Sequence, residues 1–184
     1  MVKMINPFKK FDDFFIQRIN RDLKNPILNI FFYYYTNIAG PTAIGIFTLF
    51  TLTFGRKWFK DAGQEMFLSL IFSTLFVQLL KRVFNRNRPY WILKNLNTYG
   101  IDLKDYSFPS GHTTAAFTMA TTLSLNFPTW SILFVIMALL IAVSRIYLAV
   151  HYPTDVVAGI LVGVSTSFFV HIYVFNPLMG WIFG

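Results

Sequence analysis

Long stretches without a charged residue divide the chain into apolar segments joined by short polar ones. Lys, Arg, Asp and Glu are absent from residues 28–54, 66–80, 106–144 and 156–184. A helix that crosses a bilayer needs about 20 mostly apolar residues, and these stretches with their apolar neighbours supply them. The pattern therefore predicts a protein made of membrane-spanning helices.

Proline and glycine positions divide the apolar stretches into five predicted spans. Pro26 and Pro153 each open one of them, because proline favours the first turn of a helix. The pair Gly40-Pro41 predicts a kink within the first span, and Pro128 divides the longest uncharged stretch into two helices. The predicted spans cover residues 27–54, 63–83, 111–126, 129–149 and 153–175.

The first 26 residues carry a different pattern. Phe8, Phe11, Phe15 and Ile19 recur at helical spacing, and charged residues lie between them. This pattern predicts an amphipathic helix within residues 1–26 that lies in the membrane interface. A solvated tail that merely contains aromatic residues is the alternative.

Composition narrows the class of protein further. Hydrophobic residues make up 55% of the chain and charged residues 13%, whereas an average globular protein has roughly 25% charged residues. A disordered chain would show the opposite balance. The absence of Cys excludes a disulfide scaffold, a thiolate nucleophile and Cys-ligated metal sites. We therefore predict an all-α fold, a polytopic transmembrane helix bundle that forms a single domain over residues 1–184.

The net charge of +8 indicates partners of opposite charge. In so apolar a chain, we expect the partner to be the anionic lipid of the bilayer and not nucleic acid. The sequence contains no aromatic and basic module of the kind that binds nucleic acid.

Polar and ionisable residues gather in three clusters at the ends of the predicted spans, where such residues are candidates for function. Because successive spans alternate in direction, these particular span ends all share one membrane face. The clusters are Lys81 with Arg88-Pro89, then Pro109-Ser110-Gly111-His112, and then Ser144-Arg145 with His151 and Asp155.

The first chemical feature of the clusters is an excess of positive charge. Lys81, Arg88 and Arg145 have no matching group of acids, and fixed cations suit a phosphoryl group, whose charge is spread over several oxygens. Ser110 is placed to cap the third span, which leaves free backbone N–H groups at a helix end that binds anions. Gly111 has no side chain to block a close approach.

The second feature is a pair of histidines on different spans. His151 lies in the turn before a helix, and Asp155 in the first turn of that helix can reach back to a ring nitrogen. A carboxylate there would fix the tautomer and leave the other nitrogen free to attack. His112 would then protonate the leaving oxygen. With no Asp/Glu cluster for Mg²⁺, we predict covalent phosphoryl transfer without a metal or another cofactor.

The three clusters resemble the type 2 phosphatidic acid phosphatase family, which is related to the vanadium haloperoxidases. That family has the pattern K-x6-R-P, then P-S-G-H, then S-R-x5-H-x3-D, and residues 81–155 match every position. The resemblance implies that His151 becomes a phosphohistidine, with Asp155 as its partner, and that His112 is the general acid. It also implies a phosphate-binding set made of Lys81, Arg88, Ser110, Gly111 and Arg145. Many members of the family have six spans, one more than the pattern here predicts.

Some polar and aromatic residues have no position in that pattern. Arg86 is expected to be solvated, with contact to a second phosphate as the alternative. His171, deep in the fifth span and without a nearby acid, is expected to be packed or to face a pore. Glu65 is expected to be a helix-start charge near the opposite membrane face. The aromatic run 31–35 is expected to face lipid or the interface.

The sequence thus predicts an integral membrane phosphatase that acts on a phosphomonoester or diphosphate lipid. Two alternatives use the same residues: a phosphotransferase that passes phosphate to another lipid, and a non-catalytic protein that binds or transports lipid phosphates. We expect the cytoplasmic membrane of a bacterium. The positive-inside rule places the site on the cytoplasmic face, whereas the resemblance favours the extracytoplasmic face, where bacterial members commonly act.

Overall fold

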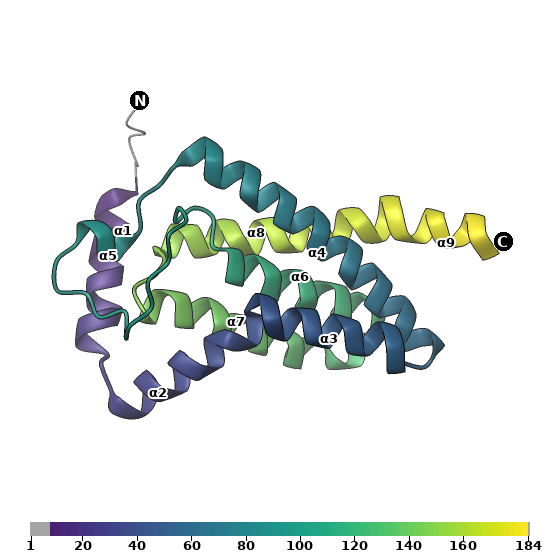
Figure 1. Ribbon diagram of the computed structural model, residues 1–184, viewed down its shortest axis with the longest axis horizontal. Coiled ribbons are helices and arrows are strands. Elements are labelled where there is room, and N and C mark those ends of the chain that lie inside the picture. Colours follow the sequence, from purple (N-terminus) through teal and green to yellow (C-terminus); the bar gives the residue numbers. More distant parts are fainter. Residues whose placement is uncertain (1–7, 184) are drawn as a thin grey trace.

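The helix α6 (Gly111–Asn126) lies at the centre of a bundle of longer helices (Figure 1). The computed structural model describes residues 8–183, with side chains up to residue 181, and this part of the chain is helical without strands. Around α6 pack α4 (Lys57–Phe84), α7 (Ser131–Tyr147) and α8 (Pro153–Val170). The other helices are α1 (Lys9–Gln17), α2 (Pro26–Tyr35), α3 (Pro41–Phe54), α5 (Pro89–Ile92) and α9 (Asn176–Phe183). The predicted all-α fold class is confirmed.

Two glycines let α8 approach α6 closely. A Cβ on Gly159 would lie 2.9 Å from the carbonyl oxygen of Ser110, and one on Gly163 would lie 2.6 Å from the carbonyl oxygen of Thr114. Any larger residue would push the helices apart, because both obstacles are backbone atoms. Small residues are the usual means of close packing between membrane helices. The contact sets the start of α8 beside the start of α6.

Three segments of the described chain are long and apolar enough to cross a membrane, namely Lys57–Ile92, Pro128–Tyr147 and Pro153–Trp181. The segments Pro26–Ala39 and Pro41–Phe54 form a fourth if they are counted as one span, and they are bent by 49°. This bend confirms the predicted kink. The remaining predicted span corresponds to α6, whose 16 residues fall short of the roughly 20 that a span requires. The multi-pass bundle is thus confirmed, with three or four of the five predicted spans meeting the length requirement.

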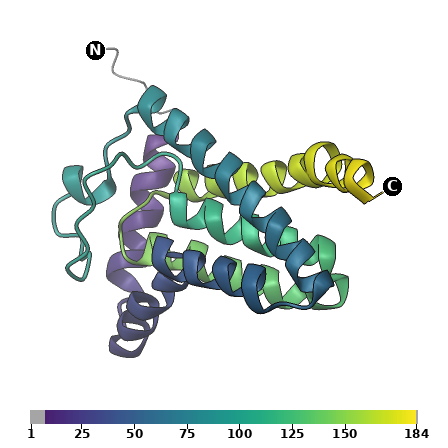
Figure 2. The ribbon, with the colours of Figure 1, turned by 45° about the vertical axis from the view of Figure 1, so that its right-hand side comes forward.

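The helix α1 lies across one end of the bundle, and α9 extends beyond the other end (Figures 1 and 2). Phe11 and Phe14 of α1 are exposed, as an amphipathic helix requires, but Asp12 and Ile16 are buried. Ile16 packs against Ala149 in the turn before α8. A helix is therefore present within the predicted segment, and the alternative of a solvated tail is wrong for its described part. Residues 1–7 of that segment lie outside the described residues.

Candidate active site

Four helix ends meet where α1 crosses the bundle (Figure 1). They are the end of α4, the start of α6, the end of α7 and the start of α8. Lys81 lies in the last turn of α4 and Arg145 in the last turn of α7, while His112 lies in the first turn of α6. The structure therefore brings the three clusters to one end of the bundle.

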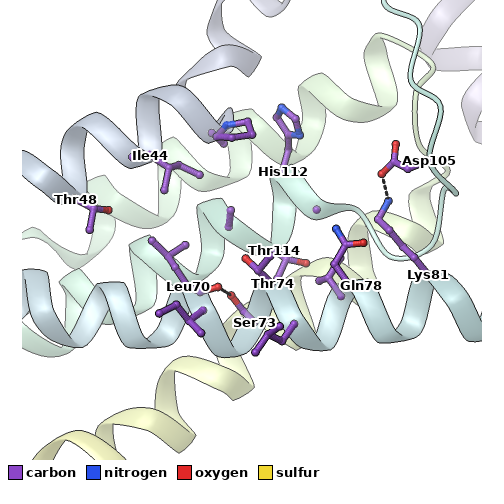
Figure 3. A pocket seen from close by; sticks show the side chains of 18 of the residues that line it. Ile44, Thr48, Leu70, Ser73, Thr74, Gln78, Lys81, Asp105, His112 and Thr114 are labelled. Carbon is purple, nitrogen blue, oxygen red and sulfur yellow. Dashed lines mark hydrogen bonds and ion pairs between the residues drawn. The ribbon is translucent and has the colours of Figure 1, made fainter.

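A cavity of about 740 Å³ connects these helix ends, and we call it the site cavity. Most of the predicted site residues line it, namely Lys81, Arg88, Gly111, His112, Arg145 and His151. The other two, Ser110 and Asp155, are fully buried and lie behind its wall. Figure 3 shows Lys81 and His112 directed into the same space from α4 and α6.

The cationic wall of the site cavity also holds an acid, Asp105, which the sequence analysis did not identify. Lys81 Nζ donates to Asp105 Oδ2 at 2.8 Å (Figure 3). Arg88 Nη2 donates to Asp105 Oδ1 at 2.7 Å. The sequence predicted no matching group of acids, and a single acid, Asp105, in fact pairs with two of the three cations. Partial burial raises the pKa of the Asp105 carboxyl, but the hydrogen bonds and charges of Lys81 and Arg88 outweigh it and lower the pKa to about 2.

Arg145 has unused capacity to bind an anion. Its side chain is buried, and its Nη1 donates to Thr36 Oγ1 at 2.7 Å. Its Nε has no hydrogen-bond partner among the described residues. A buried N–H without a partner costs about 1–3 kcal/mol, so an oxygen acceptor in the site cavity would be stabilised there. Gly111 borders the same space, and a Cβ at this position would meet no atom within 4 Å.

Ser110 caps α6, as predicted from the sequence. Its Oγ accepts a hydrogen bond from the N–H of Thr113 at 3.4 Å and lies 2.9 Å from Thr113 Oγ1. The N–H of Ser110 donates to the carbonyl oxygen of Asp155 at 3.0 Å. The hydroxyl of Ser110 is thus engaged in the cap, and the first residues of α6 that border the site cavity are Gly111 and His112.

His151 is buried, with its Nε2 3.2 Å from Arg88 Nη1. A guanidinium only donates, so Nε2 carries the lone pair and the ring proton is on Nδ1. Burial, followed by the charges of Arg88, Arg145 and Lys81, lowers the pKa of His151 well below its usual value. The ring is therefore neutral at physiological pH, with its lone pair on the nitrogen beside Arg88, as a nucleophile requires.

Asp155 lies close to His151, but the two are not hydrogen-bonded. The distance between His151 Nδ1 and Asp155 Oδ2 is 3.6 Å, which is longer than a hydrogen bond. Asp155 Oδ2 instead accepts from the N–H of Tyr152 at 2.8 Å and from the hydroxyl of Ser107. The carboxylate can therefore influence the imidazole only through its charge, and it also caps the first turn of α8.

Arg86 is enclosed by protein, so the prediction that it is solvated is wrong. Its Nη1 donates to Asp155 Oδ1 and to Thr154 Oγ1, the latter at 2.7 Å, and its Nη2 donates to Asp12 Oδ2 at 2.6 Å. The guanidinium carbon lies 4.1 Å from the centre of the Tyr152 ring. Arg86 and Asp12 are functional candidates that the sequence analysis missed, because no local pattern marks two charges that meet only when α1 docks.

Away from the cations, the site cavity continues between α3 and α4 with apolar walls. Ile44, Gly45 and Leu49 border it on α3, and Leu70 and Leu75 border it on α4. Figure 3 shows Ile44 and Leu70 facing each other across this part. Leu49 and Leu75 are also exposed on the outside of the bundle. The site cavity therefore reaches the surface between two helices that belong to candidate membrane spans.

A second buried polar group lies at the opposite end of the bundle. His171 Nδ1 is 2.9 Å from Glu65 Oε1, and Asn126 Nδ2 donates to Glu65 Oε2 at 2.8 Å. The prediction that His171 has no nearby acid is wrong, and Glu65 is buried instead of forming a surface charge. Within residues 8–183, neither this group nor any other unites three His, Asp or Glu side chains that could hold a metal ion.

Comparison with known proteins yields one family. Residues 63–178 match the family model described as PAP2 superfamily. The chain is 37% identical over 124 residues to undecaprenyl-diphosphatase from Sulfolobus acidocaldarius, a match that covers 66% of this chain and 58% of that protein. It is 32% identical over 109 residues to lipid A 1-phosphatase from Rhizobium etli, covering 55% of this chain and 45% of that protein. The chain thus spans about half the length of these curated relatives.

The fold is also similar to that of a solved structure. The crystal structure of Aquifex aeolicus LpxE superposes with a TM-score of 0.81 at 30% sequence identity. This match covers 94% of the present chain and 100% of the other. The similarity therefore includes most of the bundle, beyond the segment that carries the three clusters.

Proposed function

The chain belongs to the PAP2 superfamily, and from this membership and the geometry of the site cavity we propose that it is an integral membrane lipid phosphatase. It hydrolyses a phosphomonoester or diphosphate headgroup. The observation that carries the proposal is the site cavity, in which three cations, two histidines and an apolar groove share one space.

The headgroup phosphate binds among Lys81, Arg88 and Arg145, with the backbone N–H groups at the start of α6 as further donors. Three positive charges suit a phosphomonoester, which carries close to two negative charges at neutral pH. Asp105 pairs with Lys81 and Arg88 in this structure. The Asp105 carboxylate and an entering phosphate are both anions that bind the same two cations. Because they repel each other, Asp105 releases Lys81 and Arg88 when phosphate enters.

The first chemical step forms a phosphohistidine. His151 Nε2 attacks phosphorus in line with the lipid oxygen, so that a P–N bond forms while the P–O bond to the lipid breaks. His112 gives its proton to the departing oxygen, which would otherwise leave as a poorly stabilised alkoxide. The imidazole gains positive charge in this step, and Asp155, 3.6 Å from Nδ1, stabilises it.

The second step releases phosphate. Water attacks the phosphorus of the phosphohistidine, and the neutral His112 accepts the proton of that water. The P–N bond breaks, which returns the electron pair to Nε2 of His151 and frees inorganic phosphate. Both histidines end the cycle in their starting protonation states, so no cofactor is consumed.

Two relatives support a lipid as the substrate, because their names specify undecaprenyl diphosphate and lipid A chemistry. The apolar groove between α3 and α4 is the place for the lipid tail. A phosphate-release panel over phosphatidic acid, phosphatidylglycerol phosphate, polyprenyl diphosphate and lipid A identifies the preferred headgroup. A newly phosphorylated acceptor lipid would instead indicate a phosphotransferase, and binding without turnover would indicate a transport protein.

The central test compares two histidine variants of the purified protein in detergent. His151→Gln should abolish phosphate release, because the nucleophile is lost while the volume of the side chain is nearly kept. His171→Gln is the matched control, since this half-buried histidine lies at the other end of the bundle and outside the site cavity. Turnover by His151→Gln at the rate of the control would disprove the assignment.

Two finer parts of the proposal have their own tests. The reaction is independent of added metal, so excess EDTA should leave phosphate release unchanged, and a strict requirement for Mg²⁺ would contradict it.

The site faces the extracytoplasmic side of a bacterial cytoplasmic membrane. The chain lacks Cys, so Lys104→Cys at the site end should react with an impermeant thiol reagent in intact cells, and Arg56→Cys at the other end should not. The reverse labelling would place the site in the cytoplasm.

A further inference from the structure

We infer that Asp12 and Arg86 are positioning residues for the nucleophile. Asp12, on the N-terminal helix, neutralises part of the positive charge of Arg86, so that Asp155 keeps negative charge that acts on His151. The inference rests on the proposed function, because both residues act through the imidazole that attacks phosphorus. Asp12 lies outside the segment that matches the family model, residues 63–178, and Arg86 belongs to none of the three clusters.

The first observation is the burial of Asp12. Carboxylates are almost never fully buried unless they are paired, and Asp12 is fully buried. Its Oδ2 accepts from Arg86 Nη2 and from Thr154 Oγ1, each at 2.6 Å, and its Oδ1 accepts from the N–H of Thr154 at 3.1 Å. That N–H is one of the free donors in the first turn of α8. Asp12 therefore binds both Arg86 and the helix that follows His151.

The second observation is that one guanidinium joins two carboxylates. Arg86 donates through Nη1 to Asp155 and through Nη2 to Asp12. The rigid fork of an arginine suits this bridging position, which a lysine ammonium cannot reproduce. The side chain of Arg86 is only 18% exposed, so solvent screens these charges weakly. Within these three residues two carboxylates share one guanidinium, and with both carboxylates ionised their summed charge is −1.

This net charge lies on the Nδ1 side of the nucleophile. Asp155 Oδ2 is 3.6 Å from His151 Nδ1, while Arg86 holds its Oδ1. Attack through Nε2 makes the ring cationic, and a nearby negative charge stabilises the product of this step. Without the charge of Asp12, Arg86 would neutralise Asp155 alone, and the net charge facing the ring would fall from −1 to zero.

Asp12, Arg86 and Asp155 form a group that we call the relay. We expect the relay to act on the chemical step and not on binding of the phosphate. Asp12 and Arg86 do not border the site cavity, so neither contacts a headgroup. Loss of the Asp12 charge should therefore lower kcat, because less negative charge then faces the ring and formation of the phosphohistidine slows. KM and inhibition by inorganic phosphate should be preserved, because Lys81, Arg88 and Arg145 are untouched.

The experiment measures phosphate release by the purified full-length protein carrying Asp12→Asn. Asparagine keeps the shape of the side chain and removes its charge. Asp22→Asn is the matched control, because Asp22 is exposed on the same N-terminal segment and pairs only with Arg18 among the described contacts. We expect Asp12→Asn to lower kcat about 10-fold, the lower range for residues that support a reacting group from behind, with the control at the wild-type rate.

A double variant separates the relay from a merely structural role. Arg86→Lys keeps the charge but reaches one carboxylate only, so it should also lower kcat with KM preserved. If Asp12 acts through Arg86, the combined variant should be no slower than the slower single variant. Losses that multiply, or a rise in KM with kcat unchanged, would overturn the inference.

The outcome for wild type distinguishes this inference from the proposed function. Turnover by wild type together with its loss in His151→Gln supports the phosphatase assignment, whatever Asp12→Asn does. If Asp12→Asn then matches Asp22→Asn, the relay alone is disproved. If wild type shows no turnover on any phosphorylated lipid of the panel, the proposed function fails and the relay falls with it.

Discussion

Gly45 lies on the α3 wall of the site cavity, in the apolar part assigned to the lipid tail. A Cβ at this position would meet no atom within 4 Å. A larger side chain there would therefore start in open space, and we expect a leucine to extend into the site cavity. We therefore expect Gly45→Leu to impair turnover of a long-chain lipid while the headgroup chemistry stays intact.

The size of the effect depends on which surroundings the lipid tail leaves and which it enters. A tail that enters the groove leaves one apolar medium for another, so the roughly 25 cal/mol per Å² gained on leaving water does not apply. The loss comes from crowding, and inserting methylenes into filled apolar space typically costs about 1–3 kcal/mol. At about 1.4 kcal/mol for each factor of ten, kcat/KM for the long-chain lipid should fall about 5- to 150-fold. The helix itself should not lose stability, because leucine favours helices more than glycine by about 0.5–1 kcal/mol.

The assay measures phosphate release from the preferred long-chain lipid and from a short-chain, water-soluble analogue with the same headgroup. Gly180→Leu is the matched control, because this α9 glycine is equally open and lies outside the site cavity. Gly45→Leu should lose activity on the long-chain lipid only and keep its melting temperature. Equal losses on both substrates, or none on either, would refute the placement of the tail between α3 and α4.

Three further outcomes test other parts of the site. His112→Ala should slow release from an alkyl phosphate about 100- to 10,000-fold but slow p-nitrophenyl phosphate much less, because nitrophenolate leaves unprotonated; equal losses would contradict its role as acid. Asp105→Asn removes the internal partner of Lys81 and Arg88, so inorganic phosphate should inhibit this variant at lower concentration than wild type, and unchanged inhibition would contradict competition. The fold lowers the pKa of His151, so as pH falls the unfolded chain binds a proton that the folded chain does not. The stability linked to this pKa difference is therefore present above about pH 6.5 and is lost as pH falls. Between pH 7.5 and 5, wild type should therefore lose more of its unfolding free energy than His151→Gln, and equal losses in detergent would count against the buried neutral ring.

Much of the site was predictable because a membrane bundle has only two ends. Once the uncharged stretches are taken as alternating spans, Lys81, His112 and Arg145 are bound to lie at the same end, and all three border the site cavity. The cap at Ser110 followed from local chemistry, since a serine before a helix accepts from that helix's own N–H groups. These inferences needed only direction and sequence neighbours, which the sequence contains.

Contacts between residues on different segments could not be predicted, because helical periodicity relates only residues of the same helix. Asp105 is one of two acids in a polar loop, and its position between Lys81 and Arg88 depends on the path of that loop. Glu65 and His171 meet only because the registers of α4 and α8 bring them level. Sequence patterns show that such residues are polar, but the depth at which each lies comes from the packing of whole helices.

The neighbours Asp12 and Asp13 show where this limit lies. Successive residues of a helix differ by about 100° in direction, so both belong to the polar side of α1 in any amphipathic pattern. Asp13 pairs with Lys9 on its own helix, as charges four residues apart often do, whereas Asp12 is fully buried against Arg86 and Thr154. Helical periodicity separates polar from apolar positions, but it does not distinguish a polar side chain that meets water from one that meets a buried partner. For α1 that distinction is made by docking on α8, and Asp12, the residue that the docking buries, is the one we infer to support the nucleophile through Arg86 and Asp155.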